Sequence, residues 1–106
     1  MMPGLRQSNH LHSMDKKEAL KEIITIFVNG EILIGKDGKS TGYLSIDNEK
    51  YDRFFTLCQD VMELHFTKVI LEYQEVWEYY GVISDGNKVS YNGNNIGAVI
   101  PKRFKN

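Results

Sequence analysis

Apolar residues recur with helical spacing over one long stretch near the middle of the chain. Between Asp47 and Thr67 they fall every three or four positions, which is the spacing of one face of a helix. Asp47 suits the N-cap, and acidic residues follow in the first turn, where the helix dipole favours negative charge. The pattern predicts a main helix over about 47–67 that buries a stripe formed by Tyr51, Phe54, Phe55, Cys58, Val61, Met62 and His65.

Two patterns compete in the segment that precedes this helix. Asp15 and Glu18 form a capping pair that predicts a short helix over about 15–22. The residues that follow are rich in β-branched side chains and end at Asn29-Gly30, a strong signal for a hairpin turn. We therefore expect a hairpin with strands near 23–28 and 31–35.

The same segment also fits a single helix that runs on to Val28. Its apolar residues keep helical spacing, and Gly30 would then stand just after the C-terminus of the helix. In either case residues 35–42 read as a loop, because glycine and polar residues dominate them, and residues 43–46 read as a third short strand.

The C-terminal third of the chain has the composition of strands separated by turns. Apolar and polar residues alternate after Lys68, and the phase slips at 74–75, as a bulge or a strand break would cause. After the slip, Trp77 and Tyr79 fall on one face. Residues 84–87 and 92–95 suit turns. We expect an α+β fold: five to six short antiparallel strands with the main helix on one face.

Length and composition indicate one globular domain, over residues 14–101. The chain has 106 residues, of which 42% are hydrophobic and 25% charged. Residues 1–13 read as a disordered leader, either added by cloning or translated from an upstream start, and residues 102–106 as a basic tail. With a single cysteine and no signal-like or membrane-length apolar run, we expect a cytoplasmic protein without disulfides.

Charge is unevenly distributed along the chain, although the net charge is only −1. Residues 48–87 carry three basic and eight acidic side chains, a net charge of −5. Residues 88–106 carry four basic side chains and none that are acidic. This asymmetry favours a basic partner for the acidic segment.

Motifs for phosphate, metal or thiol chemistry are incomplete. Gly38-Lys39-Ser40 resembles the end of a phosphate-binding loop, but the first glycine of that motif is missing and a strand follows, so a turn is expected. His10 and His12 lack a third metal ligand. Cys58 and His65 lie two helical turns apart, roughly 10 Å, which is too far for thiolate activation. We expect no catalytic residue, no metal and no cofactor.

Two further classes of function are less favoured. Acid–base catalysis would use carboxylates such as Asp60, Glu63 or Glu78, which read more simply as a solvated face. Nucleic-acid binding would use the aromatic residues as stacking platforms, but glutamates are interleaved with them and would repel phosphates. An enzyme is possible but less expected, and a nucleic acid is an unlikely partner.

The remaining hypothesis is protein recognition by an acidic and aromatic strand region. Aromatic anchors inside a charged rim are typical of protein interfaces. We expect a small module that binds a basic protein partner and forms a homodimer. The alternative is a small enzyme or ligand-binding domain with a pocket between helix and sheet. The residues assigned to the interface are Glu72, Tyr73, Glu75, Trp77, Glu78 and Tyr80.

Overall fold

The computed structural model describes residues 14–104, which form four α-helices and two three-stranded sheets. The expected α+β class with five to six short strands is therefore confirmed. The leader with its His10–His12 pair lies outside the described residues, as do residues 105–106 of the basic tail. In chain order the elements are α3 (Lys16–Val28), β1 (Glu31–Ile34), β2 (Ser40–Ile46), α4 (Asn48–Thr56), the π-helix η1 (Leu57–Met62), α5 (Phe66–Glu72), α6 (Gln74–Glu78), β3 (Val82–Asp85), β4 (Lys88–Tyr91), β5 (Asn94–Ile96), β6 (Ala98–Pro101) and the 3₁₀ turn η2 (Lys102–Phe104).

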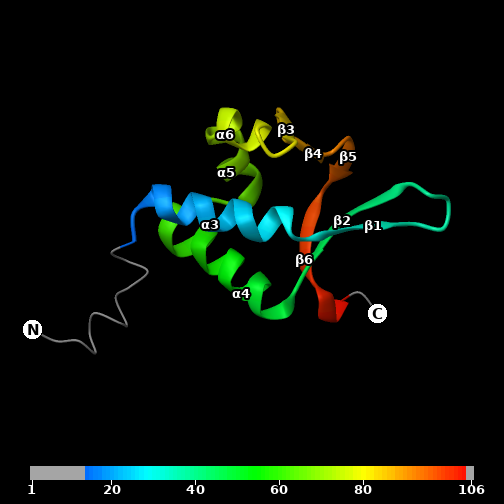
Figure 1. Cartoon of the computed structure of the whole chain (residues 1–106), viewed down its shortest axis with the longest axis horizontal. Helices are drawn as coiled ribbons and strands as arrows, with labels where there is room; N and C mark the ends of the chain where they lie inside the picture. The colour runs from blue at the N-terminus through cyan, green and yellow to red at the C-terminus, as the bar shows by residue number, and fades with distance from the viewer. Residues whose placement is uncertain (1–13, 105–106) are drawn as a thin grey trace, which may run out of the picture.

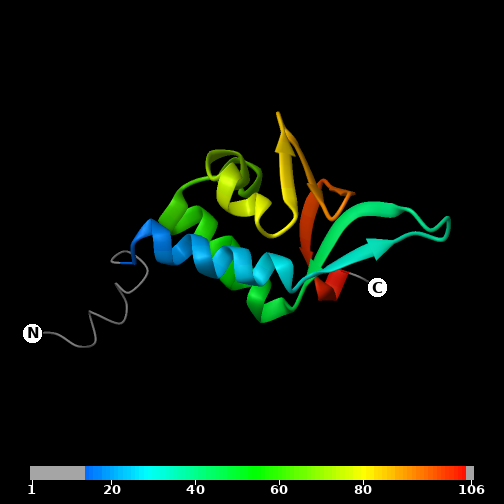
Figure 2. The ribbon, with the colours of Figure 1, turned by 45° about the horizontal axis from the view of Figure 1, so that its top comes forward.

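The helices gather at one end of the molecule and the sheets at the other. Helices α3 and α4 lie side by side, and the β1–β2 hairpin extends away from them at the opposite end (Figure 1). Helices α5 and α6 pack beside strand β3 of the second sheet (Figure 2). Helices α5 and α6 and the strands β3, β4 and β5 thus form a smaller layer above the α3–α4 pair in the view of Figure 1.

Helix α3 replaces the predicted hairpin strand. Its start is as expected, since the Asp15 side chain accepts the Glu18 N–H at 2.8 Å. The strand predicted over 23–28 is wrong, and the alternative of one helix to Val28 is confirmed. The Asn29 side chain donates to the Thr25 carbonyl at 2.8 Å and so satisfies the helix end. The β-branched residues lower helix propensity by a few tenths of a kcal/mol each, whereas burial gains roughly 1.5–3 kcal/mol per large side chain.

The main helix begins where predicted but ends early. Asp47 is the N-cap of α4, although its side chain makes no capping hydrogen bond. The helix widens into the π-helix η1 and stops at Glu63, whose φ of 58° is left-handed. The prediction of one helix to Thr67 is therefore wrong at its C-terminal end. Neither glycine nor proline marks this stop, so the sequence carries no conventional breaker there.

The residues after this break form helices rather than strands. His65 is the N-cap of α5, and α5 and α6 meet at Tyr73, whose φ of −120° and ψ of 40° break the helix. The strands predicted between Lys68 and Tyr80 are therefore wrong. Phe66, Val69 and Ile70 are buried at the spacing of one helical face of α5, and Trp77 is the buried residue of α6.

The strands form two small sheets that meet at Gly97. Strands β3, β4 and β5 are antiparallel, and their turns fall at the predicted glycines. In the other sheet the order is β1-β2-β6, and β2 pairs with β6 in parallel, so the expectation of purely antiparallel strands is wrong there. The Gly97 N–H donates to the Gly42 carbonyl at 2.7 Å, which joins the junction between β5 and β6 to β2.

Phe27 joins the helices to the second sheet at the centre of the core. Its ring is fully buried and makes tilted or edge-on contacts with Phe54, Phe66, Trp77 and Tyr91. These partners come from α4, α5, α6 and β4, so one side chain of α3 contacts three other helices and the second sheet. Tyr91 also donates its hydroxyl to the Val28 carbonyl at 3.2 Å.

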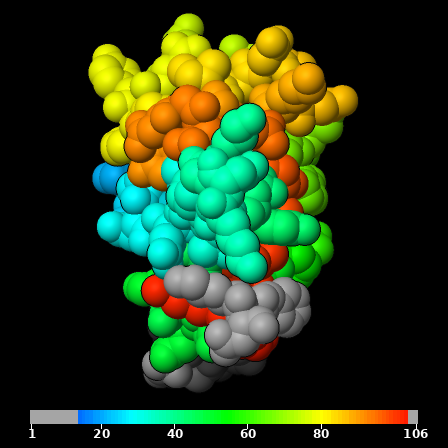
Figure 3. Space-filling view, turned by 90° about the vertical axis from the view of Figure 1, so that its right-hand side faces the viewer, coloured from blue at the N-terminus to red at the C-terminus, as the bar shows by residue number. Residues whose placement is uncertain are grey.

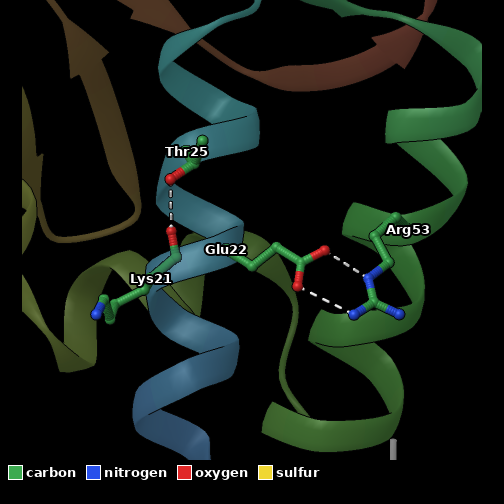
Figure 4. A network of polar contacts seen from close by, with 4 residues as sticks. All are labelled: Lys21, Glu22, Thr25 and Arg53. Atoms are coloured by element: carbon green, nitrogen blue, oxygen red, sulfur yellow. Dashed lines mark hydrogen bonds and ion pairs between the residues drawn. The ribbon is translucent and has the colours of Figure 1, made fainter.

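A two-point ion pair links α3 to α4 at the surface. Arg53 donates through Nε and Nη2 to the two carboxylate oxygens of Glu22, at 2.5 and 3.0 Å (Figure 4). The hydrogen bonds to Glu22 raise the pKa of Arg53 above its ordinary value, while burial opposes the rise. Because both side chains are about one third exposed, the pair contributes at most about 1 kcal/mol. It orients the two helices more than it stabilises them.

Candidate functional site

Exposed apolar side chains concentrate at the C-terminal end of α6 and the start of β3. Of the seven large apolar residues exposed in the described chain, four fall between positions 76 and 83. Val76, Tyr79, Tyr80 and Ile83 are 40, 89, 50 and 46% exposed. Glu72, Glu75 and Glu78 are exposed in the same segment. We call these four apolar residues and three glutamates together the acidic–aromatic surface. The segment from α6 to β4 occupies the top of the molecule in Figure 3.

The six residues predicted for an interface divide between surface and core. The three glutamates and Tyr80 are exposed, whereas Tyr73 is half-buried and packs against the core. Trp77 has no exposed surface, and its ring meets Phe27 edge-on at a centroid distance of 5.3 Å. Trp77 is therefore a core residue that holds α6 in place, and it presents no surface to a partner.

A shallow hollow adjoins the acidic–aromatic surface where α5 meets α6. It has a volume of about 360 Å³ and is lined by residues 71–76. Glu72 and Glu75 both contribute to its lining, so two acidic residues border one hollow. A basic side chain has the length and charge to enter such a space.

A second, more enclosed pocket lies between strand β6 and the segment formed by α4 and η1, where the main helix was predicted. Its volume is about 230 Å³. Five of the seven residues of the stripe predicted for the main helix line one wall, and β6 with the preceding Gly97 supplies the other. Val61 and Met62 of the stripe do not line it. Phe55 is half-exposed and stacks on Tyr51 at a centroid distance of 6.3 Å. The lining residues are Tyr51, Phe54, Phe55, Cys58, Gln59, Leu64, His65, Phe66, Gly97, Ala98 and Val99.

His65 lines this pocket, and its Nδ1 contacts Thr67. It is exposed, and its Nδ1 accepts the Thr67 N–H at 3.3 Å as the cap of α5. The sequence placed His65 on the main helix, in the same stripe as Cys58. The structure places it after the helix break instead, yet both residues line the pocket.

Cys58 is a buried, protonated thiol. It is 4% exposed, and burial raises its pKa from 9.0 to about 12. We expect native protein to resist thiol-specific labelling at pH 8, because the thiolate is the reactive form.

Above about pH 9 the Cys58 thiol ionises in the unfolded chain but not in the folded one. The free energy of unfolding should therefore fall between pH 9 and 12, and it should fall less in Cys58→Ala. Labelling kinetics and urea titrations measure both effects, and rapid labelling of native protein would contradict the burial.

The segment that resembles a phosphate-binding loop forms the turn between β1 and β2. Gly38 has a φ of 82°, and the Gly35 N–H donates to the Lys39 carbonyl at 2.7 Å. The prediction of a turn is confirmed.

Over residues 14–104 no three His, Cys, Asp or Glu side chains form a group suited to a metal ion. No helix in that range is long and apolar enough to cross a membrane.

Two local features position the acidic–aromatic surface. The break at Tyr73 separates α6 from α5, and Gly81 ends the turn after α6 with a φ of 83°. Between them, the Tyr80 N–H donates to the Trp77 carbonyl at 2.9 Å and the Gly81 N–H to the Glu78 carbonyl at 3.1 Å.

Comparison of the chain with protein-family models, curated proteins and solved structures found no match.

Proposed function

We propose that this chain is a protein-binding module that holds a basic partner on its acidic–aromatic surface. The observation that supports it is the concentration of exposed apolar residues at positions 76–83. A folded chain gains nothing in stability from leaving a tyrosine 89% exposed beside half-exposed valine and isoleucine side chains. Such clusters are typical of interaction sites. We keep the expectation of a cytoplasmic protein as part of this proposal.

The chemistry of this surface defines the partner. Val76, Tyr79 and Tyr80 stand at positions i, i+3 and i+4, so they share one side of the helical segment. Tyrosine brings a large apolar ring and a hydroxyl to an interface at low entropic cost. The neighbouring glutamates add negative charge along the same segment. A complementary surface presents lysine or arginine around an apolar centre, and the hollow lined by Glu72 and Glu75 accepts one such basic side chain.

A charge-reversal experiment tests this proposal. The probe is an 18-residue peptide of lysine and leucine at helical spacing, with a glutamate–leucine peptide as its counterpart. Glu75→Lys with Glu78→Lys should weaken binding of the basic peptide at least 10-fold, because each lost charge pair at an interface costs about 1 kcal/mol or more. Tyr79→Ala should weaken it by a similar factor. Association of the wild-type protein should slow as salt rises.

The matched control reverses two exposed carboxylates on α4. Glu49→Lys with Asp52→Lys changes the net charge by the same amount and leaves the acidic–aromatic surface intact. Biosensor titrations at two salt concentrations compare the variants. If both double variants weakened binding of the basic peptide equally, net charge alone would account for the effect. Equal affinity of the wild type for the basic and the acidic peptide would overturn the proposal.

The proposal includes a homodimer, which uses a different part of the surface. Two copies of an acidic surface repel one another, so self-association through it is disfavoured. Ile34 and Tyr43 of the β1–β2 hairpin are 54 and 46% exposed, far along the chain from α6. We assign the dimer contact to this hairpin. Sedimentation velocity should show a dimer for the wild type and a monomer for Ile34→Asp. A wild-type monomer at tens of micromolar would contradict the dimer alone.

A further inference from the structure

The pocket between the main helix and β6 shares no residue with the acidic–aromatic surface. It also has the composition of a ligand site rather than of a packing fault. One wall contains an aromatic stripe (Tyr51, Phe54 and Phe55) together with Cys58, Gln59 and Leu64, whereas the opposite wall is formed by Gly97, Ala98 and Val99. These three residues are small, so their side chains occupy little of the space between the two walls. Protein interiors are otherwise closely packed, so this space is a distinct feature of the domain.

Local backbone irregularities occur where this pocket is built. Cys58 and Gln59 belong to the π-helix, which displaces them from ordinary helical positions. Glu63 follows in the left-handed region, at a φ of 58°, and directs Leu64 and His65 to the rim. π-Helical turns and left-handed non-glycine residues both cost stability and are frequent at binding sites. The π-helix and the left-handed residue that ends it thus form one irregular segment beside the pocket, and such a segment points to a function.

The polar groups of the pocket determine which ligand chemistry fits. Nδ1 of the His65 ring is engaged by Thr67, whose backbone N–H lies at 3.3 Å and whose Oγ1 lies at 2.9 Å. In the tautomer in which Nδ1 accepts from Thr67, Nε2 carries the ring proton and is a hydrogen-bond donor, and Gln59 adds a side-chain amide. None of the lining residues is Asp, Glu, Lys or Arg, so nothing in the lining balances a full charge on a ligand.

We propose that this pocket binds a small, flat, uncharged molecule: a single ring that carries one hydrogen-bond acceptor. The ring lies between the aromatic stripe and β6, and the acceptor meets His65 Nε2. The volume of about 230 Å³ exceeds the roughly 150 Å³ of an apolar cavity that holds benzene, which leaves space for a substituent. The buried, protonated Cys58 thiol forms part of the wall and makes no covalent bond to the ligand.

Two matched probes test the ligand chemistry on the full chain. Acetophenone carries a carbonyl acceptor on its ring, and ethylbenzene has nearly the same shape without it. Both should cause saturable shifts of backbone amide signals at positions lining the pocket in two-dimensional NMR. His65→Phe keeps an aromatic ring but removes the donor. It should weaken acetophenone roughly 3- to 10-fold, the value of one hydrogen bond, and leave ethylbenzene unchanged.

A filling variant tests the location. Ala98→Phe should abolish binding of both probes, whereas Ala98→Ser should leave both unchanged. The same spectra report whether each variant is folded, and Ala98→Leu takes the place of Ala98→Phe if the larger ring unfolds the domain. Saturable shifts that persist in the filled variant would place binding elsewhere and overturn the proposal. The proposal would also be overturned if neither acetophenone nor ethylbenzene gave saturable shifts at millimolar concentration. Tyr79→Ala, which alters the other surface, should change neither result.

Discussion

Trp77→Ala should lower the free energy of unfolding by about 3–5 kcal/mol, the usual effect of truncating a buried aromatic side chain. Small domains are stable by only about 5–15 kcal/mol, so the variant should be partly unfolded under mild denaturing conditions. The indole is fully buried and contacts Phe27, the residue that joins the helices to the second sheet. Its loss therefore leaves a cavity at the point where α6 attaches to the core.

The chain provides a matched control two residues away. Tyr79 is also a large aromatic residue of this segment but is 89% exposed, so Tyr79→Ala should change stability by less than about 0.5 kcal/mol. The loss of unfolding free energy in Trp77→Phe should fall between those of the two alanine variants. This variant keeps an edge-on ring and removes an Nε1–H that has no hydrogen-bond partner. Urea titrations followed by far-UV circular dichroism measure all three. Equal effects of Trp77→Ala and Tyr79→Ala would mean that α6 is not docked on the core.

The difference between these two residues also explains why the sequence identified only part of the acidic–aromatic surface. In a strand, residues 77 and 79 lie on the same face, which is how the alternating pattern placed them. In a helix two residues differ by about 200°, so they point in nearly opposite directions. Once residues 66–78 are helical, Trp77 enters the core, and Tyr79 and Val76 reach the surface. The exposed glutamates were predicted correctly because charged side chains are rarely buried in either structure.

Elements with a local cause were predictable. The start of α3 depends on Asp15 and Glu18, and the β4–β5 turn depends on Asn92-Gly93, where both residues have positive φ. The strand at 43–46 and the N-cap at Asp47 were also found. Each of these features arises from a few adjacent residues, so no knowledge of distant contacts is needed.

Elements with a tertiary cause were not predictable in this way. The run from Ile23 to Val28 has strand propensity, but Phe27 gains contacts from four other elements when the run is helical. Burial on that scale outweighs propensity. The pocket has the same origin. His65 was expected two turns from Cys58 on one helix, and only the left-handed Glu63 brings the loop carrying His65 to the pocket rim.

Gly81→Ala should lower the free energy of unfolding by about 2–4 kcal/mol. Gly81 has a φ of 83°, and an added Cβ in left-handed backbone costs roughly 1–2 kcal/mol. That Cβ would also lie 2.5 Å from Asn92 Oδ1, which must move away, and overpacking of this kind costs roughly 1–3 kcal/mol. Gly81 ends the turn after α6 and its carbonyl accepts the Asn92 N–H at 3.0 Å, so the strain acts on the support of the acidic–aromatic surface.

Two further variants separate backbone strain from the clash with Asn92. Gly86 also has positive φ, at 64°, but a Cβ there would meet no atom within 4 Å, so Gly86→Ala should show the backbone cost alone. Asn92 itself has a φ of 51°, and Asn92→Gly removes its side chain while keeping that conformation accessible. In the Asn92→Gly background, Gly81→Ala should therefore cost no more than Gly86→Ala does in the wild type. Urea titrations of this double-mutant cycle measure the coupling. A cost for Gly81→Ala that is unchanged by Asn92→Gly would assign the whole effect to the backbone and exclude the steric contact.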